Sequence, residues 1–270
     1  MTGGARSRSV ASVSPTISVV IPVKNDAALL AECLRLLTAQ TRRPDEIVVV
    51  DNDSSDDSAE VARAGGARVV GCARPGIAAA ASTGYDVAKG EIIARLDADC
   101  VPSANWIAAI ANAFTEHPDA AAVTGGARFV DGPAVLRRWL AAAYLGAYYG
   151  LTALTLGHPP VFGSNMAMRR SAWEDVRDTV HRDPFVHDDL DLAFHLGEKH
   201  RIRFERTLRM GISMRPFADL GSLMVRGARG GHTVLVHYPY GGAPWRLGRR
   251  LRTVASQRLG ALVPGSGDSR

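Results

Sequence analysis

Residues 17–23 read ISVVIPV, an uninterrupted apolar run that is rich in β-branched side chains. A run of this kind is typical of a strand that is buried on both faces, as the strands of parallel sheets are. Apolar residues then recur at helical spacing over residues 29–37, and Pro44 precedes a second buried strand at Ile47–Val50. The beginning of the chain therefore predicts a strand–helix–strand unit.

The same alternation continues to residue 100. We expect third and fourth strands at Ala67–Cys72 and Glu91–Leu96, with an alanine-rich helix between them at Ile77–Ala88. Repeated units of this length predict an α/β fold in which helices flank a mostly parallel central sheet. Ligands of such sheets collect outside the carboxyl ends of the strands, and Asp51 and Asp97 both lie there.

The second half of the chain is less regular. Helices are expected at Trp106–Phe114 and Trp139–Leu156, and another begins at Asp188. The segments Val161–Met168 and Ile202–Met214 are expected to be extended.

Two acids follow the fourth strand in the segment Leu96-Asp97-Ala98-Asp99. Hard oxygen ligands of this kind suit Mg²⁺ or Mn²⁺ that carries a substrate's phosphates. Such an ion neutralises the charge that builds up on a departing nucleotide diphosphate. The alternative for this tripeptide alone is a solvated turn at the end of a strand.

A second acidic segment, VVVDNDSSDDS at residues 48–58, follows the second strand. We interpret its last three residues as turn and helix-capping groups. Asp51 and Asn52 are expected to face a ligand, because an acid at this place accepts hydrogen bonds from ribose or a base edge in dinucleotide folds. The chain has neither a Gly-x-Gly-x-x-Gly nor a P-loop motif, which argues against NAD and ATP phosphate cradles.

Over roughly residues 17–215 the sequence resembles the family 2 glycosyltransferases of the GT-A fold. The matching pieces occur in the family's order: Ile21-Pro22-Val23-Lys24-Asn25, Val49-Val50-Asp51-Asn52, Ala88-Lys89-Gly90-Glu91 leading into Leu96-Asp97-Ala98-Asp99, Gly163-Ser164-Asn165-Met166-Ala167-Met168-Arg169-Arg170, and Asp188-Asp189-Leu190-Asp191-Leu192. Each piece alone is weak evidence, but five pieces in order with compatible spacing are strong evidence.

The resemblance implies a site for a nucleotide-sugar donor and a divalent metal, Mg²⁺ or Mn²⁺. The expected donor-binding residues are Pro22, Lys24, Asn25, Asp51, Asn52, Gly76, Asp97 and Asn165. The metal residues are Asp97 and Asp99, with Asp99 the expected direct ligand.

The acid pair Asp188 and Asp189 resembles the family motif that supplies the catalytic base. We assign the base to Asp189 and an orienting role to Asp188. A carboxylate at a helix start is kept ionised by the helix dipole, and it could take the proton of the acceptor hydroxyl. The alternative is an ordinary pair of N-terminal helix acids. The family's usual reaction is a single displacement that inverts the anomeric carbon of a hexose.

The chain departs from the family at two places. Ala81 stands in Ala80-Ala81-Ser82, where the family often carries an arginine, and Arg74 and Arg95 are both candidates to replace that charge. Many members also place a histidine near the metal, whereas the aligned strand here carries Ser213 and Arg215. We interpret His232 and His237 as structural.

The segment Trp139–Gly157 has 19 residues and no charge. Its tyrosines, threonines and glycines favour a core or interface helix, then a membrane-surface helix, and least of all a membrane span. Residues 201–270 hold thirteen arginines, no lysine and three acids, a net charge of +10, and the chain as a whole carries +5. The arginines Arg137, Arg138, Arg246, Arg249, Arg250 and Arg252 would suit anionic headgroups. A peripheral enzyme of the cytoplasmic membrane face with a lipid-linked, cell-envelope acceptor is therefore our hypothesis, and nucleic acid is not an expected partner.

The predicted organisation is a disordered lead at residues 1–15, a GT-A domain at 16–215 and a partly helical basic extension at 216–270. The domain divides into a donor half, residues 16–100, and an acceptor half, residues 101–215. Three cysteines without metal-ligand spacing are typical of a reduced, cytoplasmic protein. Two rival functions remain: a nucleotidyltransferase, which usually carries a glycine- and lysine-rich loop after the first strand, and a degenerate, non-catalytic sugar-nucleotide-binding protein.

Overall fold

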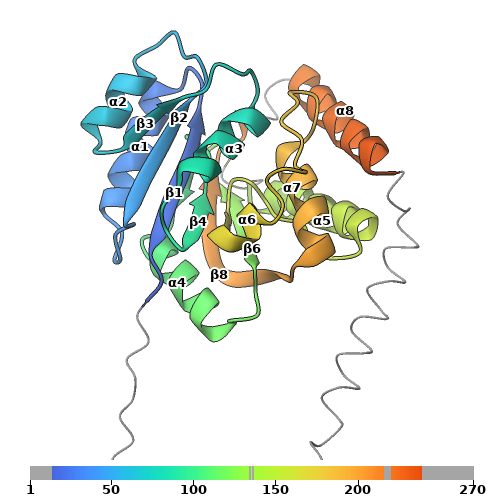
Figure 1. Cartoon of the computed structure of the whole chain (residues 1–270). Coiled ribbons are helices and arrows are strands. Elements are labelled where there is room, and N and C mark those ends of the chain that lie inside the picture. Colours follow the sequence, from blue (N-terminus) through green and yellow to red (C-terminus); the bar gives the residue numbers. More distant parts are fainter. Residues whose placement is uncertain (1–13, 134, 136, 216–219, 239–270) are drawn as a thin grey trace, which may run out of the picture.

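The computed structural model describes residues 14–133, 135, 137–215 and 220–238 (Figure 1). Over these residues the strands form an eight-stranded sheet in the order β3-β2-β1-β4-β7-β6-β8-β5. The strands are β1 Ile17–Val23, β2 Glu46–Asp51, β3 Arg68–Gly71, β4 Ile92–Arg95, β5 Val101–Pro102, β6 Ala122–Phe129, β7 Met166–Arg169 and β8 Ile202–Ile212. The helices are α1 Ala27–Thr38, α2 Ser58–Ala64, α3 Ile77–Val87, α4 Trp106–Glu116, α5 Arg137–Leu156, α6 Arg170–Glu174, α7 Asp188–Lys199 and α8 Leu220–His237.

The first four strands are parallel, as the strand–helix alternation predicts. β1 pairs with β2 and β4, and β2 pairs with β3. Every residue of β1 is buried, which accounts for the absence of polar alternation in its sequence. The carboxyl ends of β1, β2 and β4 thus meet at one edge of the sheet.

The prediction of a mostly parallel sheet is wrong, because the sheet is mixed. β7 runs antiparallel to both of its neighbours, β4 and β6, and β5 runs antiparallel to β8. The chain that leaves β6 passes through α5 and enters β7 at the edge where β6 ended, so the connection does not return to the starting edge as a parallel crossover must. The second half of the sequence lacks the regular alternation that enforces such crossovers.

Helices cover both faces of the sheet (Figure 1). Leu30, Leu34 and Leu37 of α1 pack with α2 and α4 on one face, and α3, α6 and α7 pack on the other. α3 lies very close to the sheet, since a Cβ on Gly84 would stand 2.3 Å from a methyl group of Val20. Both faces of the sheet are therefore covered by helices, as the α/β prediction expects.

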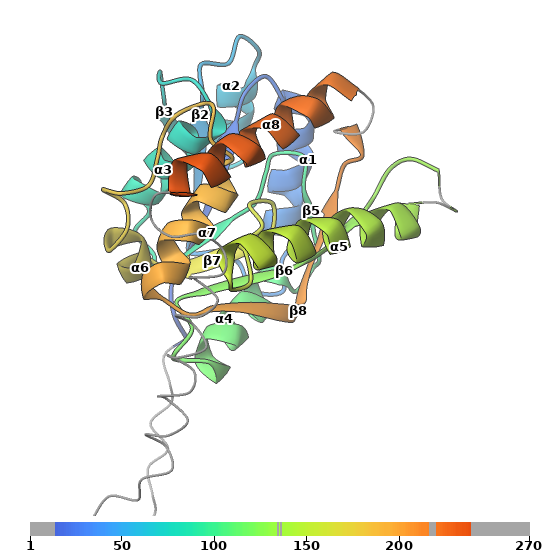
Figure 2. The same ribbon diagram turned by 90° about the vertical axis from the view of Figure 1, so that its right-hand side faces the viewer.

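α5 lies at the surface of the described structure, so the core alternative of the predicted core or interface helix is not met, while the interface and membrane-surface alternatives stay predictions. Ala141 and Leu156 are its buried residues, and its tyrosines are partly buried against the core. Trp139 and Leu154 are 73% and 72% exposed. Figure 2 shows α5 and α8 along the same side of the molecule with α7 between them. None of the helices that the structure describes has the length and apolarity needed to cross a membrane.

The predicted terminal segments are described only in part. α8 lies in the predicted basic extension. Most of the predicted N-terminal lead lies outside the described residues, as do the arginines Arg246, Arg249, Arg250 and Arg252.

Candidate functional site

Acids that are distant in sequence meet at the carboxyl edge of the sheet. Asp97 follows β4, and Asp188 and Asp189 open α7. Arg95, the last residue of β4, joins them: its guanidinium donates to Asp97 at 3.1 Å and forms a short ion pair with Asp188. The Arg95 side chain is only 3% exposed. A buried guanidinium needs such partners, so this pairing holds the end of β4 against the start of α7.

Arg95 also lies beside Ala81, the position where the family often carries an arginine. Ala81 and Arg95 line the same small cavity between α3 and α7, together with Ser82, Tyr85 and Asp188. Arg74, the other candidate, is exposed, and its backbone carbonyl accepts a hydrogen bond from Asn52. Of the two candidates, Arg95 is therefore the one that brings a guanidinium to the side of Ala81.

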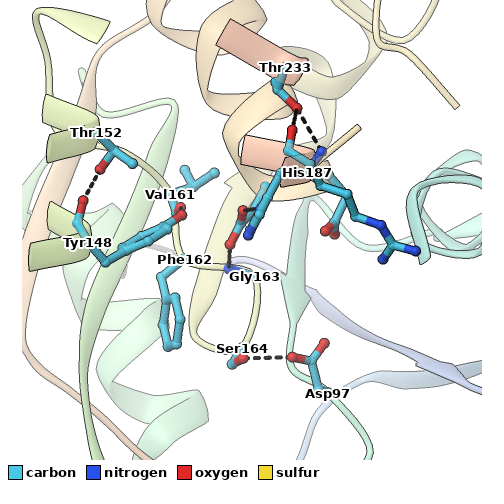
Figure 3. Close-up of polar contacts among 12 residues, drawn as sticks. Asp97, Tyr148, Thr152, Val161, Phe162, Gly163, Ser164, His187 and Thr233 are labelled. Atoms are coloured by element: carbon cyan, nitrogen blue, oxygen red, sulfur yellow. Dashed lines mark hydrogen bonds and ion pairs between the residues drawn. The ribbon is translucent and has the colours of Figure 1, made fainter. Parts of the chain in front are cut away.

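The loop before β7 binds both sets of acids (Figure 3). The backbone N–H of Gly163 donates to Asp189 Oδ2 at 3.0 Å, and Ser164 Oγ donates to Asp97 Oδ2 at 2.6 Å. A Cβ on Gly163 would lie 2.8 Å from the guanidinium carbon of Arg95. Only glycine lets the loop approach Arg95 this closely, which explains the glycine of the Gly163-Ser164-Asn165 segment.

Asp189 is paired with a residue that the sequence analysis did not identify. His187 Nδ1 lies 2.5 Å from Asp189 Oδ1. The Asp189 charge, opposed by burial, raises the pKa of His187 to about 9. Burial would raise the pKa of Asp189, but the His187 charge and the Gly163 N–H lower it below its ordinary value. Asp189 is therefore ionised at neutral pH, and the histidine just before the acid pair was the available signal.

Asp97 and Asp99 are close enough to share one cation. Their carboxylate oxygens and the thiol of Cys100 lie within 4.8 Å of one another. Burial and the charge of Asp97 raise the pKa of Asp99, although a neighbouring guanidinium, that of Arg215, opposes this rise. Burial also raises the pKa of Cys100 well above its usual value, and sulfur is a soft ligand that does not suit Mg²⁺ or Mn²⁺. The two carboxylates fit a hard divalent ion.

Arg215 occupies Asp99, the acid that a divalent ion would bind. Its guanidinium contacts Asp99 Oδ2 at 2.9 Å and Asp26 Oδ2 at 2.7 Å. Arg215 is one of the two residues that stand where the family often has a metal-binding histidine. The side chain is 52% exposed, so a divalent ion can displace it at little cost.

The predicted donor residues after β1 lie near the same edge. Pro22 is buried within β1, whereas Lys24 and Asn25 are exposed. Lys24 Nζ donates to the Asn52 carbonyl at 3.1 Å. Asn25 has a φ of +54°, and its side chain accepts the Ser55 N–H at 2.7 Å.

The predicted donor residues after β2 contact the next loop. Asp51 is partly exposed and accepts the Ser54 N–H at 3.0 Å. Asn52 is buried: its amide donates to the carbonyls of Cys72 and Arg74 and accepts the Gly76 N–H. Gly76, with a φ of +105°, precedes α3. Asn52 thus shapes the loop before α3, while the Asp51 carboxylate keeps an exposed part.

Asn165 is placed differently from the expectation. It is fully buried, accepts from the Trp106 indole at 2.8 Å, and donates to the carbonyls of Gly126 and Leu208. These bonds occupy both ends of its amide. We therefore give Asn165 a role in joining α4, β6 and β8, and do not retain it as a donor contact.

Comparison with known proteins identifies the family of the chain. The family model described as Glycosyl transferase family 2 matches residues 18–177, more than half of the chain. The chain belongs to this family. Members of the family are glycosyltransferases, and the curated relatives described next carry that activity in their names.

Glycosyltransferase AglE of Haloferax volcanii is 36% identical over 104 residues, which cover 36% of this chain and 34% of that protein. An undecaprenyl-phosphate 4-deoxy-4-formamido-L-arabinose transferase of Pseudomonas paraeruginosa is 42% identical over 94 residues, 31% of this chain and 27% of that protein. The matches thus span about a third of the length of these relatives. The solved structure of mannosyltransferase PcManGT from Pyrobaculum calidifontis, in complex with GDP-Man and Mn²⁺, covers 96% of this chain and 77% of its own at 21% identity and a TM-score of 0.63. That likeness shows the GT-A fold.

Proposed function

We propose that this family 2 glycosyltransferase moves a hexose from a nucleoside-diphosphate sugar to an acceptor hydroxyl with inversion at the anomeric carbon, and that it depends on a divalent metal. The observation that carries the proposal is the joining of Asp97 to the acids of α7. Arg95 and the Gly163–Ser164 loop both bind one acid of each set. A group held at Asp97 would therefore lie close to a base at Asp189.

The donor side is formed by the carboxyl edge of the sheet. We assign Asp51 to the nucleoside, with Pro22, Lys24, Asn25, Asn52 and Gly76 forming the walls around it. Lys24 and Arg95 supply positive charge toward the diphosphate. Arg95 replaces the arginine that the family often carries at the position of Ala81. This favours an active enzyme over the degenerate binding protein.

Asp97 and Asp99 would hold the metal, with Asp99 as the direct ligand. A bound Mg²⁺ or Mn²⁺ would neutralise charge on the diphosphate as it leaves. The complex of PcManGT with GDP-Man and Mn²⁺ supports both the donor class and the metal.

The chemistry on the acceptor side rests on Asp189. The acceptor oxygen bonds to the anomeric carbon, the bond from that carbon to the diphosphate oxygen breaks with its electron pair, and the hydroxyl proton passes to Asp189. His187 keeps Asp189 ionised at neutral pH, and Asp188, held by Arg95, orients the start of α7.

We further propose a lipid-linked acceptor. A cavity of about 580 Å³ lies between α5 and β8, lined by apolar side chains that include Leu145, Tyr149, Leu154 and Phe204. The exposed Trp139 and Leu154 of α5 would enter a membrane surface beside it, as amphipathic surface helices do. The transferase named for undecaprenyl phosphate among the relatives supports this acceptor class. The location that follows is the cytoplasmic face of a membrane.

Thermal denaturation with a panel of nucleotide sugars, each with and without Mn²⁺, tests the donor and the metal together. Ligands that bind only the folded state stabilise it by mass action, by about 2.7 kcal/mol at 100 times Kd, and this gain in the free energy of unfolding raises the melting temperature. We expect one donor class to stabilise the chain only when Mn²⁺ is present, and Asp99→Asn to abolish that shift. Equal shifts with and without Mn²⁺ would refute metal dependence, and no shift with any sugar nucleotide would refute the donor class.

Sedimentation with anionic vesicles tests the membrane part. We expect the chain to pellet with phosphatidylglycerol vesicles, and less so at high salt, since exposed charges are screened. Substituting serine for Trp139 and Leu154 should reduce pelleting. A supernatant that keeps all the protein at low salt contradicts the peripheral membrane contact.

A further inference from the structure

Three histidines and one aspartate meet between α7 and α8, outside the set of acids that the proposed reaction uses. His181 comes from the loop before α7, Asp191 and His195 from α7, and His237 from α8. One ligand-type atom of each lies within 4.8 Å of the others. Asp191 and His195 are four residues apart, so they share one helix face. We propose that these four residues bind a transition-metal ion, with Zn²⁺ the expected one, that ties α8 to α7.

The distances between the ligand atoms suit a tetrahedral ion. A tetrahedron with metal–ligand bonds of about 2.0–2.1 Å has edges of about 3.4 Å. His237 Nε2 lies 3.3 Å from His195 Nε2 and 3.4 Å from Asp191 Oδ1. His195 Nε2 lies 3.8 Å from Asp191 Oδ1. These three atoms therefore form one face of a tetrahedron of the required size.

His181 supplies the fourth ligand. Its Nδ1 lies 2.7 Å from Asp191 Oδ1, a hydrogen-bond distance that a bound ion would lengthen. His181 is the most exposed of the four at 37%, against 0% for Asp191 and 4% for His237. Because His181 is on a loop, it is the ligand that can most readily adjust.

Outer contacts orient these ligands as metal-binding residues are usually oriented. His237 Nδ1 lies 2.9 Å from the Thr233 carbonyl, so an Nδ1–H donates there and the Nε2 lone pair points into the cluster. The backbone N–H of His181 donates to Asp191 Oδ2 at 2.9 Å, which leaves Asp191 Oδ1 facing the histidine rings.

The charge balance of the cluster also favours a cation. Asp191 is fully buried, and all its ion-pair partners among the described residues are histidines. A buried carboxylate is costly unless it is paired or bound to a metal. The rival arrangement is a metal-free hydrogen-bond network in which a protonated histidine balances Asp191.

The position of the site gives it a consequence for the enzyme. The hydroxyl of Thr233, one turn before His237, accepts the His187 N–H at 2.7 Å. α8 therefore contacts the backbone beside Asp189. An ion that fixes α8 to α7 would hold this contact as well.

Metal content and cobalt substitution test the proposal on the full chain, prepared without a histidine tag. After exhaustive dialysis against metal-free buffer, we expect close to one zinc per chain, as one site requires. His195→Gln and His237→Gln should lose the zinc, while Asp99→Asn and the matched control His232→Gln, an exposed residue of the same helix, should retain it. The Co²⁺-loaded parent should show the intense visible absorption of a tetrahedral site.

A second variant covers the case in which the α8 variant does not fold. His181→Gln changes a loop residue, and it should weaken Zn²⁺ binding by more than the roughly 10–100-fold that loss of an outer hydrogen-bond partner causes. A chelator should lower the melting temperature of the parent and leave that of His181→Gln unchanged. A parent chain that binds no zinc after Zn²⁺ reconstitution, or zinc binding that both His237→Gln and His181→Gln leave intact, would overturn the proposal in favour of the hydrogen-bond network.

Discussion

The pairing of His187 with Asp189 makes a quantitative prediction about stability and pH. The pKa of His187 rises from 6.5 to about 9 in the folded state, mainly because of the Asp189 charge, with a smaller contribution from Asp188. A raised folded pKa contributes stability that is fully present below pH 6.5 and is lost as the pH rises through 9. At about 1.4 kcal/mol for each pH unit, the pair contributes roughly 3 kcal/mol at pH 6. The side chain is 26% exposed, so solvent screening is limited.

The assay is urea denaturation of the parent and of His187→Gln at half-unit steps from pH 6 to pH 10. The parent should lose roughly 3 kcal/mol more than His187→Gln across this range, because the other titrating groups are common to both chains and cancel in the difference. His232→Gln, an exposed histidine of α8, is the control and should keep the slope of the parent. The reasoning fails if the difference between parent and His187→Gln is independent of pH.

Three further substitutions test separate parts of the structure. Gly84→Ala should lower the free energy of unfolding by about 1–3 kcal/mol, because its Cβ would stand 2.3 Å from a valine methyl of β1. Gly146→Ala is the control and should not lower it, because a Cβ at Gly146 would have no atom within 4 Å. Urea denaturation curves that show equal effects for the two variants would contradict this packing. Arg95→Met leaves its two carboxylate partners without a cation and should cost about 3 kcal/mol in the same assay and weaken donor binding, whereas an unchanged stability would show that the ion pairs contribute nothing. Arg215→Ala removes the cation that pairs with Asp99, so titration calorimetry should show Mn²⁺ binding up to about fivefold tighter, since an exposed pair is worth about 1 kcal/mol; weaker binding would instead make Arg215 part of the site.

The first half of the fold could be predicted from the sequence because its signals are local. β1 is apolar throughout, and the helix after it shows a clear 3.6-residue period. The acids at the strand ends followed from the same alternation, and the family resemblance added the acid pair at the start of α7. β6, in contrast, carries two adjacent glycines and a register shift between Gly125 and Gly126, so it has no clean strand period. Missing β6 also hid the antiparallel placement of β7.

The candidate site could be predicted only where one short segment contains the whole signal. The acids Asp97, Asp99, Asp188 and Asp189 stand in such segments. The contact of Arg95 with Asp188 spans 93 residues, and the choice between Arg95 and Arg74 needed the fold. Asn165 stands in a family motif, but its neighbours from α4, β6 and β8 are distant in sequence, so its burial could not be foreseen.

The most direct test of the central claim compares turnover and donor affinity in Asp189→Asn. The variant keeps an acceptor for the Gly163 N–H and removes the base, so the donor should bind with a Kd close to that of the parent while the rate constant for transfer falls. General base catalysis contributes about 10²–10⁴-fold, and a loss in that range is the predicted result. Transfer at the rate of the parent with unchanged donor affinity would contradict the assignment of Asp189 as the base.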